Sequence, residues 1–168
     1  FNVDFCNIAL LSADHTELRV CVHYSPDGDD LPALGTSLPL DRHMAYRRVI
    51  ETRKSLVLSQ CNHASVWPLE GFEDKARSHW LLLIPLLSRG KVIGAVGLGT
   101  AQTWKPEQPG QVFSPAEIKL AETIAGQVAG AIEIVRLLEE EQQQRQIAER
   151  ALREMKLLYN VNAAFKTF

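Results

Sequence analysis

The segment 79–100, HWLLLIPLLSRGKVIGAVGLGT, places two apolar runs on either side of a short polar turn at 88–91. Runs of Leu, Ile and Val without polar alternation are typical of strands that are covered on both faces. A short turn that contains glycine favours a hairpin between such strands. We therefore predict the central hairpin of an antiparallel sheet, and the rest of the chain must supply a layer on each side of it.

The segments before this hairpin predict further strands and one helix. Residues 1–11 and 17–24 are predicted as a pair of strands, because apolar and polar side chains alternate in the second of them. Residues 55–58 predict a short strand, and 35–38 predict a short edge strand within a loop rich in Pro, Gly and Asp. Asp41 is predicted to be the N-cap of a helix over 42–52. The long irregular segment 59–78 is predicted to be a functional lid or a disordered loop.

A long helix is predicted to begin at Ser114, because SPAE at 114–117 has the Ser and Glu spacing of a capping box. Gly126 and Gly130 are predicted to let this helix approach the sheet closely. Beyond Glu139 the composition is typical of a coiled coil. Its seam is predicted to run through Ile134, Leu138, Glu141, Arg145, Ala148, Leu152, Met155 and Tyr159. The polar middle of this seam predicts a weak coil, and a single solvated helix is the alternative.

Composition excludes several classes of function. The net charge of -2 lacks the basic character of nucleic-acid binding proteins, so no nucleic-acid partner is predicted. No apolar run reaches the roughly 20 residues that span a membrane, so direct membrane insertion is not predicted either. The 3 cysteines do not form a secreted disulfide framework. These features together predict a cytoplasmic protein or the cytoplasmic part of a larger one.

The predicted order of elements and two motifs resemble those of a GAF domain. The motif residues are Pro85, Leu86, Gly90, Val92, Ile93, Gly94, Val96, Leu98, Phe113, Glu117, Leu120, Ala125, Gln127, Ala129, Ala131 and Ile132. The resemblance implies an α+β fold that is GAF/PAS-like (profilin-like). In such a fold an antiparallel sheet of five or six strands lies between helical layers, and here the long C-terminal helix continues as a coiled coil. The chain departs from the family by beginning on the first strand without the usual first helix, so a preceding segment is expected.

The same resemblance implies two parts and a regulatory role. Residues 1–138 are expected to form the GAF-like domain and 139–168 a coiled-coil linker helix, while 152–168 is also similar to the first helix of a following sensor module. The implied function is a non-catalytic sensory or regulatory domain of a signal-transduction protein, such as a sensor histidine kinase of a two-component system. The implied partners are a second copy bound through the C-terminal helix, a downstream output domain and a small-molecule ligand. A dimerisation spacer that binds no ligand is the alternative.

In this family a ligand pocket lies between one sheet face and a layer of helix and loops. The polar residues that map to its walls here are Arg42, His43, Tyr46, Arg47, Cys61, His63, Trp67 and His79. No particular cofactor is predicted, although Cys61 and His63 leave a bilin or heme sensor as a minor alternative. Metal binding by this pair lacks a third and a fourth ligand. The family's Asn-Lys-Phe-Asp-Glu set for cyclic nucleotides is not found.

Two further hypotheses concern chemistry. Centring the first hairpin at Ala13 and Asp14 places Cys6 opposite Cys21, a pair that could sense redox state. The motifs of nucleophilic catalysis and of phosphate-binding loops do not occur in the sequence, so this chain is not predicted to be an enzyme. Residues 140–168 contain no histidine to accept a phosphoryl group, so the phosphoacceptor segment of a histidine kinase is not predicted here, and a kinase activity of the full-length protein is left open.

Overall fold

A computed structural model of the chain describes residue 3 and residues 5–24, 34–61, 79–100 and 113–165. The segment 79–100 forms the predicted hairpin, with strands β5 (His79–Ser88) and β6 (Lys91–Thr100). Arg89 and Gly90 make the turn between them with φ of 49° and 77°, the left-handed conformation that two-residue hairpin turns require. Nine consecutive residues of β5 pair with β6, and the register of the two strands shifts between Leu86 and Leu87.

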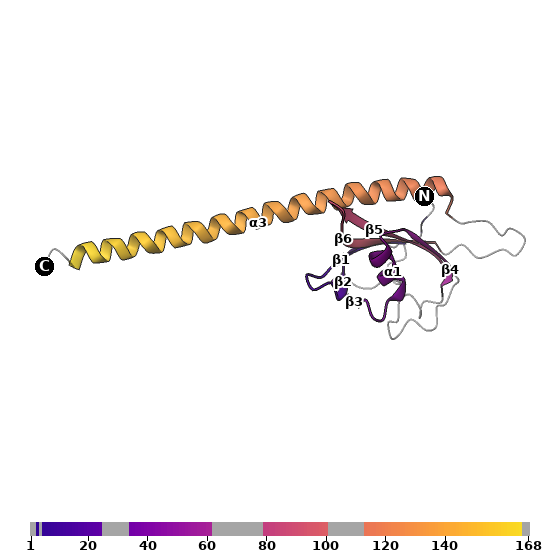
Figure 1. The fold of residues 1–168 in the computed structure, drawn as a ribbon, viewed down its shortest axis with the longest axis horizontal. Helices are drawn as coiled ribbons and strands as arrows, with labels where there is room; N and C mark the ends of the chain where they lie inside the picture. The colour runs from indigo at the N-terminus through magenta and orange to yellow at the C-terminus, as the bar shows by residue number, and fades with distance from the viewer. Residues whose placement is uncertain (1–2, 4, 25–33, 62–78, 101–112, 166–168) are drawn as a thin grey trace, which may run out of the picture. The chain divides into compact units, whose positions relative to one another are not determined.

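This hairpin is part of a six-stranded antiparallel sheet (Figure 1). Its other strands are β1 (Phe5–Leu11), β2 (Glu17–Tyr24), β3 (Ser37–Pro39) and β4 (Leu56–Cys61). The strand order is β3-β2-β1-β6-β5-β4, and all neighbouring pairs are antiparallel. The predicted fold class is therefore confirmed, with strands β1 and β6, far apart in the chain, paired at the middle of the sheet.

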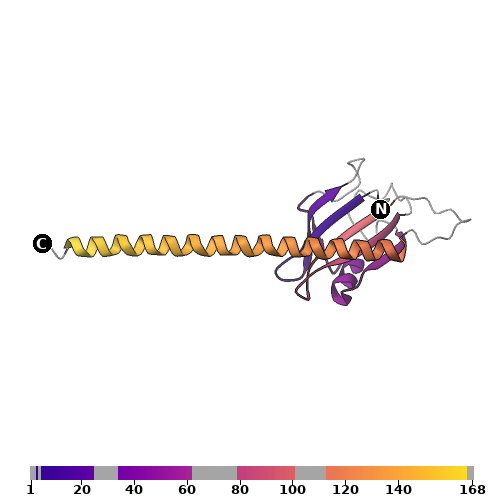
Figure 2. The same ribbon diagram turned by 90° about the horizontal axis from the view of Figure 1, so that it is seen from above.

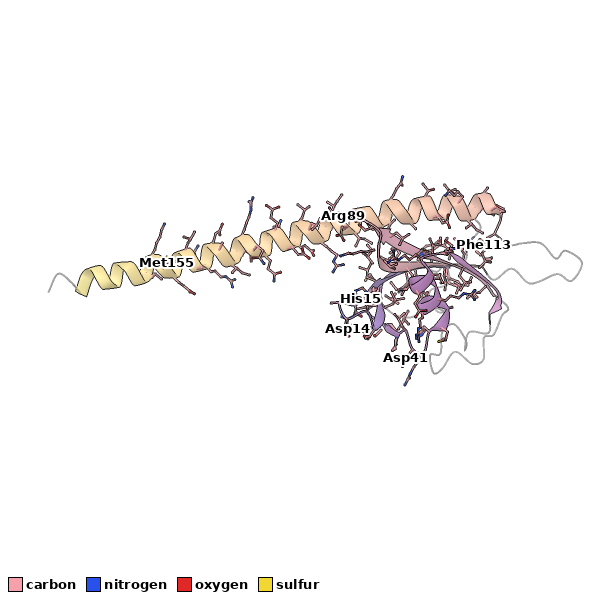
Figure 3. All side chains as sticks on the ribbon, in the orientation of Figure 1. Asp14, His15, Asp41, Arg89, Phe113 and Met155 are labelled. Carbon is pink, nitrogen blue, oxygen red and sulfur yellow. The ribbon has the colours of Figure 1, made fainter. Side chains whose placement is uncertain are left out.

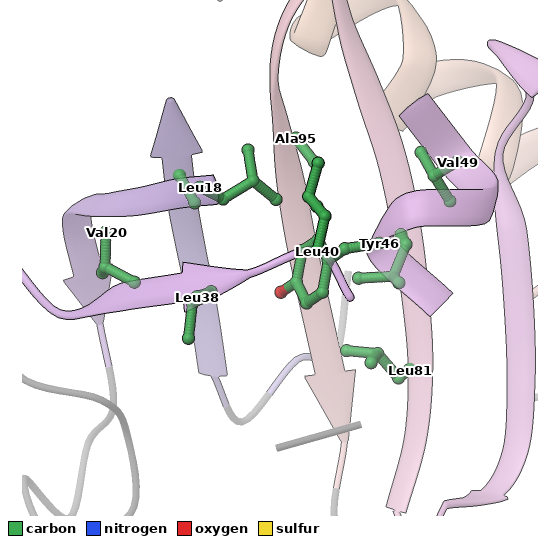
Figure 4. Packing of buried hydrophobic residues seen from close by; sticks show 10 residues of the cluster. Leu18, Val20, Leu38, Leu40, Tyr46, Val49, Leu81 and Ala95 are labelled. Atoms are coloured by element: carbon green, nitrogen blue, oxygen red, sulfur yellow. The ribbon is translucent and has the colours of Figure 1, made fainter. Parts of the chain in front are cut away.

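Helix α1 (Met44–Thr52) covers one face of the sheet. It buries Tyr46 and Val49 against strand residues such as Leu81 and Ala95 (Figure 4). The rest of this buried cluster is aliphatic and consists of Ala9, Leu18, Val20, Leu38, Leu40 and Leu83. Each Leu or Val side chain of this cluster, when withdrawn fully from water, contributes about 1.5–3 kcal/mol to stability, so this layer supplies much of the driving force for folding.

The predicted N-cap of α1 is wrong. His43 occupies the N-cap position, and its side chain makes no capping hydrogen bond. The backbone N–H groups of Arg42 and His43 both donate to the carbonyl of Pro39, at 3.1 Å each. This tight turn after β3 leaves Asp41 two residues before the N-cap position, and α1 begins at Met44.

The second helix, α3 (Pro115–Phe165), begins at the predicted capping box. The N–H of Glu117 donates to Ser114 Oγ at 3.2 Å, and the N–H of Ser114 donates to Glu117 Oε2 at 2.8 Å. The first turns of α3 lie on the sheet face opposite α1 (Figures 1 and 2). Buried Phe113 precedes them (Figure 3).

Small residues form the buried stripe of α3, but they are not the predicted glycines. Ala121, Ala125 and Ala129 are buried at successive helical turns. Gly126 is exposed, and a Cβ added to Gly126 or Gly130 would meet nothing within 4 Å. The glycines therefore lie beside the contact stripe, since the alanine positions are those that repeat every four residues toward the strands.

The register of β1 and β2 contradicts the predicted cysteine pair. Cys6 lies opposite Tyr24, and the register shifts between Ile8, paired with Val22, and Ala9, paired with Val20. Cys21 is the extra residue of this β-bulge and is exposed. The turn is centred one residue later than predicted, because Leu11 pairs with Leu18, and the bulge shifts the register once more, so the two changes together move Cys21 away from Cys6.

Contacts within the chain group it into two units, Phe1–Gly130 and Ala131–Phe168. In the second unit the helix continues through Phe165, and Ile134, Leu138, Leu152 and Met155 of the predicted seam are exposed. Between them Glu141 and Arg145 form an ion pair of 3.1 Å within the helix. Among the residues that the structure describes, no helix has the length and apolar character to cross a membrane.

Candidate functional site

A buried polar group lies beneath α1, where the first strand faces the helix. Asn7 of β1 is fully buried, and its register partner on β6 is Gly97. Asn7 Oδ1 accepts one hydrogen bond from the N–H of Gly97 at 3.1 Å and another from the Tyr46 hydroxyl at 3.3 Å. This small network joins β1, β6 and α1 in the middle of an otherwise aliphatic layer.

Three nitrogen atoms in this part of the domain are buried without a hydrogen-bond partner. They are Asn7 Nδ2, His23 Nδ1 and His43 Nε2. The opposite ring nitrogen of His43 lies 2.7 Å from the carbonyl oxygen of Pro39, which fixes that ring at the start of α1. Buried polar groups are rarely left unpaired in folded proteins, so each of these atoms marks a place where a bound molecule would gain a hydrogen bond.

Burial determines the ionisation of the titratable groups near this network. Burial raises the pKa of Tyr46, because the phenolate would lose its hydration, and the hydrogen bond to Asn7 only partly opposes this rise. Burial also raises the pKa of the Cys6 thiol on the opposite side of β1. Both groups are therefore neutral near pH 7, and Cys6 lacks the thiolate character of a reactive cysteine.

The structure separates the predicted pocket residues into two groups. His43 and Tyr46 are buried, as expected for residues that line an interior site. Arg42 and Arg47 are on the exposed side of the same segment, and Arg47 Nε donates to Glu51 Oε1 at 2.7 Å. Cys61 and His79 are described only as backbone partners at the ends of β4 and β5, while His63 and Trp67 lie outside the described residues.

Arg47 instead lines an open surface hollow of about 730 Å³. Its other lining residues come from the β1–β2 turn, from the ends of β2 and β3, and from α1: His15, Thr16, Glu17, Pro39, Leu40, Asp41, Ile50 and Glu51. His15 and Asp41 mark this end of the domain in Figure 3. The guanidinium of Arg47 is already paired with Glu51, and the further carboxylates of Glu17 and Asp41 leave the lining of this hollow with an excess of negative charge.

Sequence reasoning missed Asn7, His23 and Gly97. One signal for Asn7 was available, since it is a lone amide within the apolar run FCNIALL. Gly97 carried no comparable signal among the other glycines of β6. A Cβ at this position would lie 2.7 Å from Asn7 Oδ1 and 3.0 Å from the Tyr46 hydroxyl. Glycine is therefore needed here to leave room for the network.

A hydrogen bond connects the end of α1 to α3 across the edge of the sheet. α1 ends at Thr52 with Arg53 as its C-cap, and Ser55, just before β4, donates from its hydroxyl to Glu122 Oε1 at 2.8 Å. Glu122 also lies 4.0 Å from Lys119 Nζ, one turn earlier in α3. A displacement of α1 along the sheet would therefore act on α3 through a short segment of backbone and one side-chain contact.

Comparisons with known proteins agree on one family. The profile of the GAF domain matches residues 1–133. No curated protein matches the chain. Among solved structures, a GAF domain of a two-component sensor histidine kinase from Bacillus halodurans has 20% identity and a TM-score of 0.61, covering 82% of this chain and 86% of that one.

Two other solved structures are similar in fold. The GAF domain of a phosphoenolpyruvate-protein phosphotransferase from Coxiella burnetii has 16% identity and a TM-score of 0.62, with 80% of this chain and 74% of that chain covered. A GAF domain/HD domain protein from Geobacter sulfurreducens has 17% identity and a TM-score of 0.60, with 82% and 84% covered.

Proposed function

Because this chain belongs to the GAF domain family, a family of sensory and regulatory modules, we propose that it binds a small molecule beneath α1 and transmits its occupancy to α3. The same fold occurs in a sensor histidine kinase and in a phosphotransferase, so a regulatory module of a larger signalling protein is the role that fits the chain. The chain itself is proposed to be non-catalytic, and its output belongs to a domain that follows α3.

The Ser55–Glu122 hydrogen bond is the observation that carries this proposal. The buried layer beneath α1 contains the polar network and the unpartnered nitrogens, which support a ligand on that side. The first turns of α3 lie on the opposite face of the sheet. A signal must therefore pass from one face to the other, and Ser55 provides a direct route because it follows the end of α1 and bonds to α3.

The second unit supports a proposal that the output helix acts as a dimer. Exposed apolar residues of the seam, such as Leu138 and Leu152, would be withdrawn from water by a second copy. The Glu141–Arg145 ion pair lies between them, where apolar packing is interrupted. A seam of this kind can hold two packings of similar energy, and a modest difference in ligand affinity is enough to favour one of them.

The test is a disulfide scan of the full-length protein. The native cysteines are first replaced by serine, and single cysteines are then placed along 138–159. Crosslinking is compared between protein as purified and protein stripped of small molecules, with native mass spectrometry to record what is lost. A shift in the pattern of crosslinked positions supports transmission. If removal of a bound molecule leaves the crosslinking pattern unchanged, transmission is contradicted. If the protein carries and binds no small molecule, it is a dimerisation spacer.

A further inference from the structure

One row across the sheet places two unpartnered nitrogen atoms on neighbouring strands. His23 of β2 is the register partner of Asn7 on β1, and Gly97 of β6 is the partner of Asn7 on its other side. Side chains of directly opposed residues point to the same face of a sheet and lie close together. Tyr46 contacts Asn7 from α1, so this face is the one beneath α1.

The orientation of the Asn7 amide follows from its partners. The N–H of Gly97 can only donate, so the atom it contacts must be the oxygen of the side chain. The amide nitrogen is therefore Nδ2, which can only donate and has no acceptor, although Asn7 is fully buried. A buried donor without a hydrogen bond costs free energy, and an incoming acceptor would remove that cost.

The bulge at Cys21 brings the second nitrogen to this place. Leu18 and Val20 of β2 point into the buried layer beneath α1. With strict alternation the side chain of residue 23 would point to the opposite face. The extra residue between Val20 and Val22 exchanges the two faces for the residues that follow it. His23 is thereby re-aimed toward Asn7, and its Nδ1 is buried without a partner.

We propose that Asn7 Nδ2 and His23 Nδ1 form the polar anchor of the ligand site, and that they bind an uncharged molecule through a carbonyl oxygen. This inference rests on the proposed function, since it names the chemistry of the same site. Nδ2 supplies one donor to the oxygen, and the imidazole supplies a second donor in the tautomer that carries its proton on Nδ1. The surrounding buried cluster consists of aliphatic side chains and Tyr46, so a ketone, amide or lactam suits it better than a carboxylate ion.

The test compares two probes of the same ring size, cyclopentanone and cyclopentane, by NMR of the isotope-labelled wild-type chain. Methyl signals of Leu81 and Leu83 report entry of either probe into the layer beneath α1. The side-chain amide signal of Asn7 and the ring-nitrogen signal of His23 report contact with the carbonyl. The exposed side-chain amide of Gln127 is the internal control for non-specific effects of solvent.

We expect both probes to shift the methyl signals, and only cyclopentanone to shift the Asn7 and His23 signals. Asn7→Leu should lower the affinity for cyclopentanone about fivefold relative to the affinity for cyclopentane, as expected for one lost hydrogen bond. Methyl shifts with both probes, but no selective response at Asn7, would overturn the anchor and leave the proposed function intact. If neither probe shifts the methyl signals, no ligand space exists beneath α1, and both proposals fail. The wild-type measurement decides the outcome even if Asn7→Leu does not fold.

Discussion

Replacing Ser55 with alanine should weaken the attachment of α3 to the rest of the domain. Ser55 Oγ donates to Glu122 Oε1 at 2.8 Å, a hydrogen bond to a charged acceptor. Buried bonds of this type contribute about 1.5–3 kcal/mol to stability. The Glu122 side chain retains 39% exposure, so screening by solvent reduces the expected contribution. We expect a coupling free energy of about 1 kcal/mol between the two side chains.

A double-mutant cycle measures this coupling by denaturant unfolding of the chain. It compares Ser55→Ala, Glu122→Ala and the double variant with the wild type, and the cycle cancels the loss of the Lys119–Glu122 ion pair. Thr123→Ala is the matched control, because its hydroxyl donates to the carbonyl of Lys119 within α3, at 2.9 Å, and does not reach Ser55.

The control should combine additively with Ser55→Ala, whereas Glu122→Ala should not. A coupling below about 0.3 kcal/mol between Ser55 and Glu122 would be within the range of independent sites. That result would refute the idea that this contact links α1 to α3, and the transmission route proposed above would have to run elsewhere.

Three other predictions follow from packing, burial and exposure. Gly126→Ala should raise the free energy of unfolding by about 0.5–1 kcal/mol, because a Cβ there meets nothing within 4 Å. Ala125→Leu should lower the free energy of unfolding by about 1–3 kcal/mol, because Ala125 is buried. If denaturant unfolding shows a loss of stability for Gly126→Ala and a gain for Ala125→Leu, the assigned contact stripe is contradicted. Burial raises the pKa of Tyr46, so the unfolded state ionises first and the domain should lose stability as pH rises above about 10; in unfolding curves measured across that range, Tyr46→Phe should lose less than the wild type, and an equal loss would exclude this cause. Leu138→Ser should weaken self-association in sedimentation experiments more than Leu137→Ser, which lies off the seam, and equal effects would argue against a seam-specific dimer.

Local signals in the sequence were sufficient for most of the fold. The apolar runs and the glycine-containing turn predicted β5 and β6, and Ser114 with Glu117 predicted the start of α3, because each signal acts through neighbouring residues. The position of Asp41 was misleading, since the turn formed by hydrogen bonds to Pro39 depends on where β3 pairs with β2.

The candidate site was less predictable because it depends on register. A bulge at Cys21 leaves no clear trace in the alternation of ELRVCVHY, yet it decides which side of the sheet receives His23. The unpartnered nitrogen of Asn7 likewise depends on Gly97 and Tyr46, which approach it from segments distant in the sequence. His43 and Tyr46 were among the predicted pocket residues, since they lie one turn apart at the start of a helix that was recognised.

The end of α1 holds a residue in an unfavourable backbone conformation. Arg53 has a φ of 57°, in the left-handed region where a side chain with a Cβ costs about 1 kcal/mol more than glycine. The N–H of Arg53 donates to the carbonyl of Val49 at 2.9 Å, and this bond holds the residue in that conformation. The junction that leads to Ser55 is therefore kept in place by a backbone hydrogen bond against a local conformational cost, which Arg53→Gly would remove.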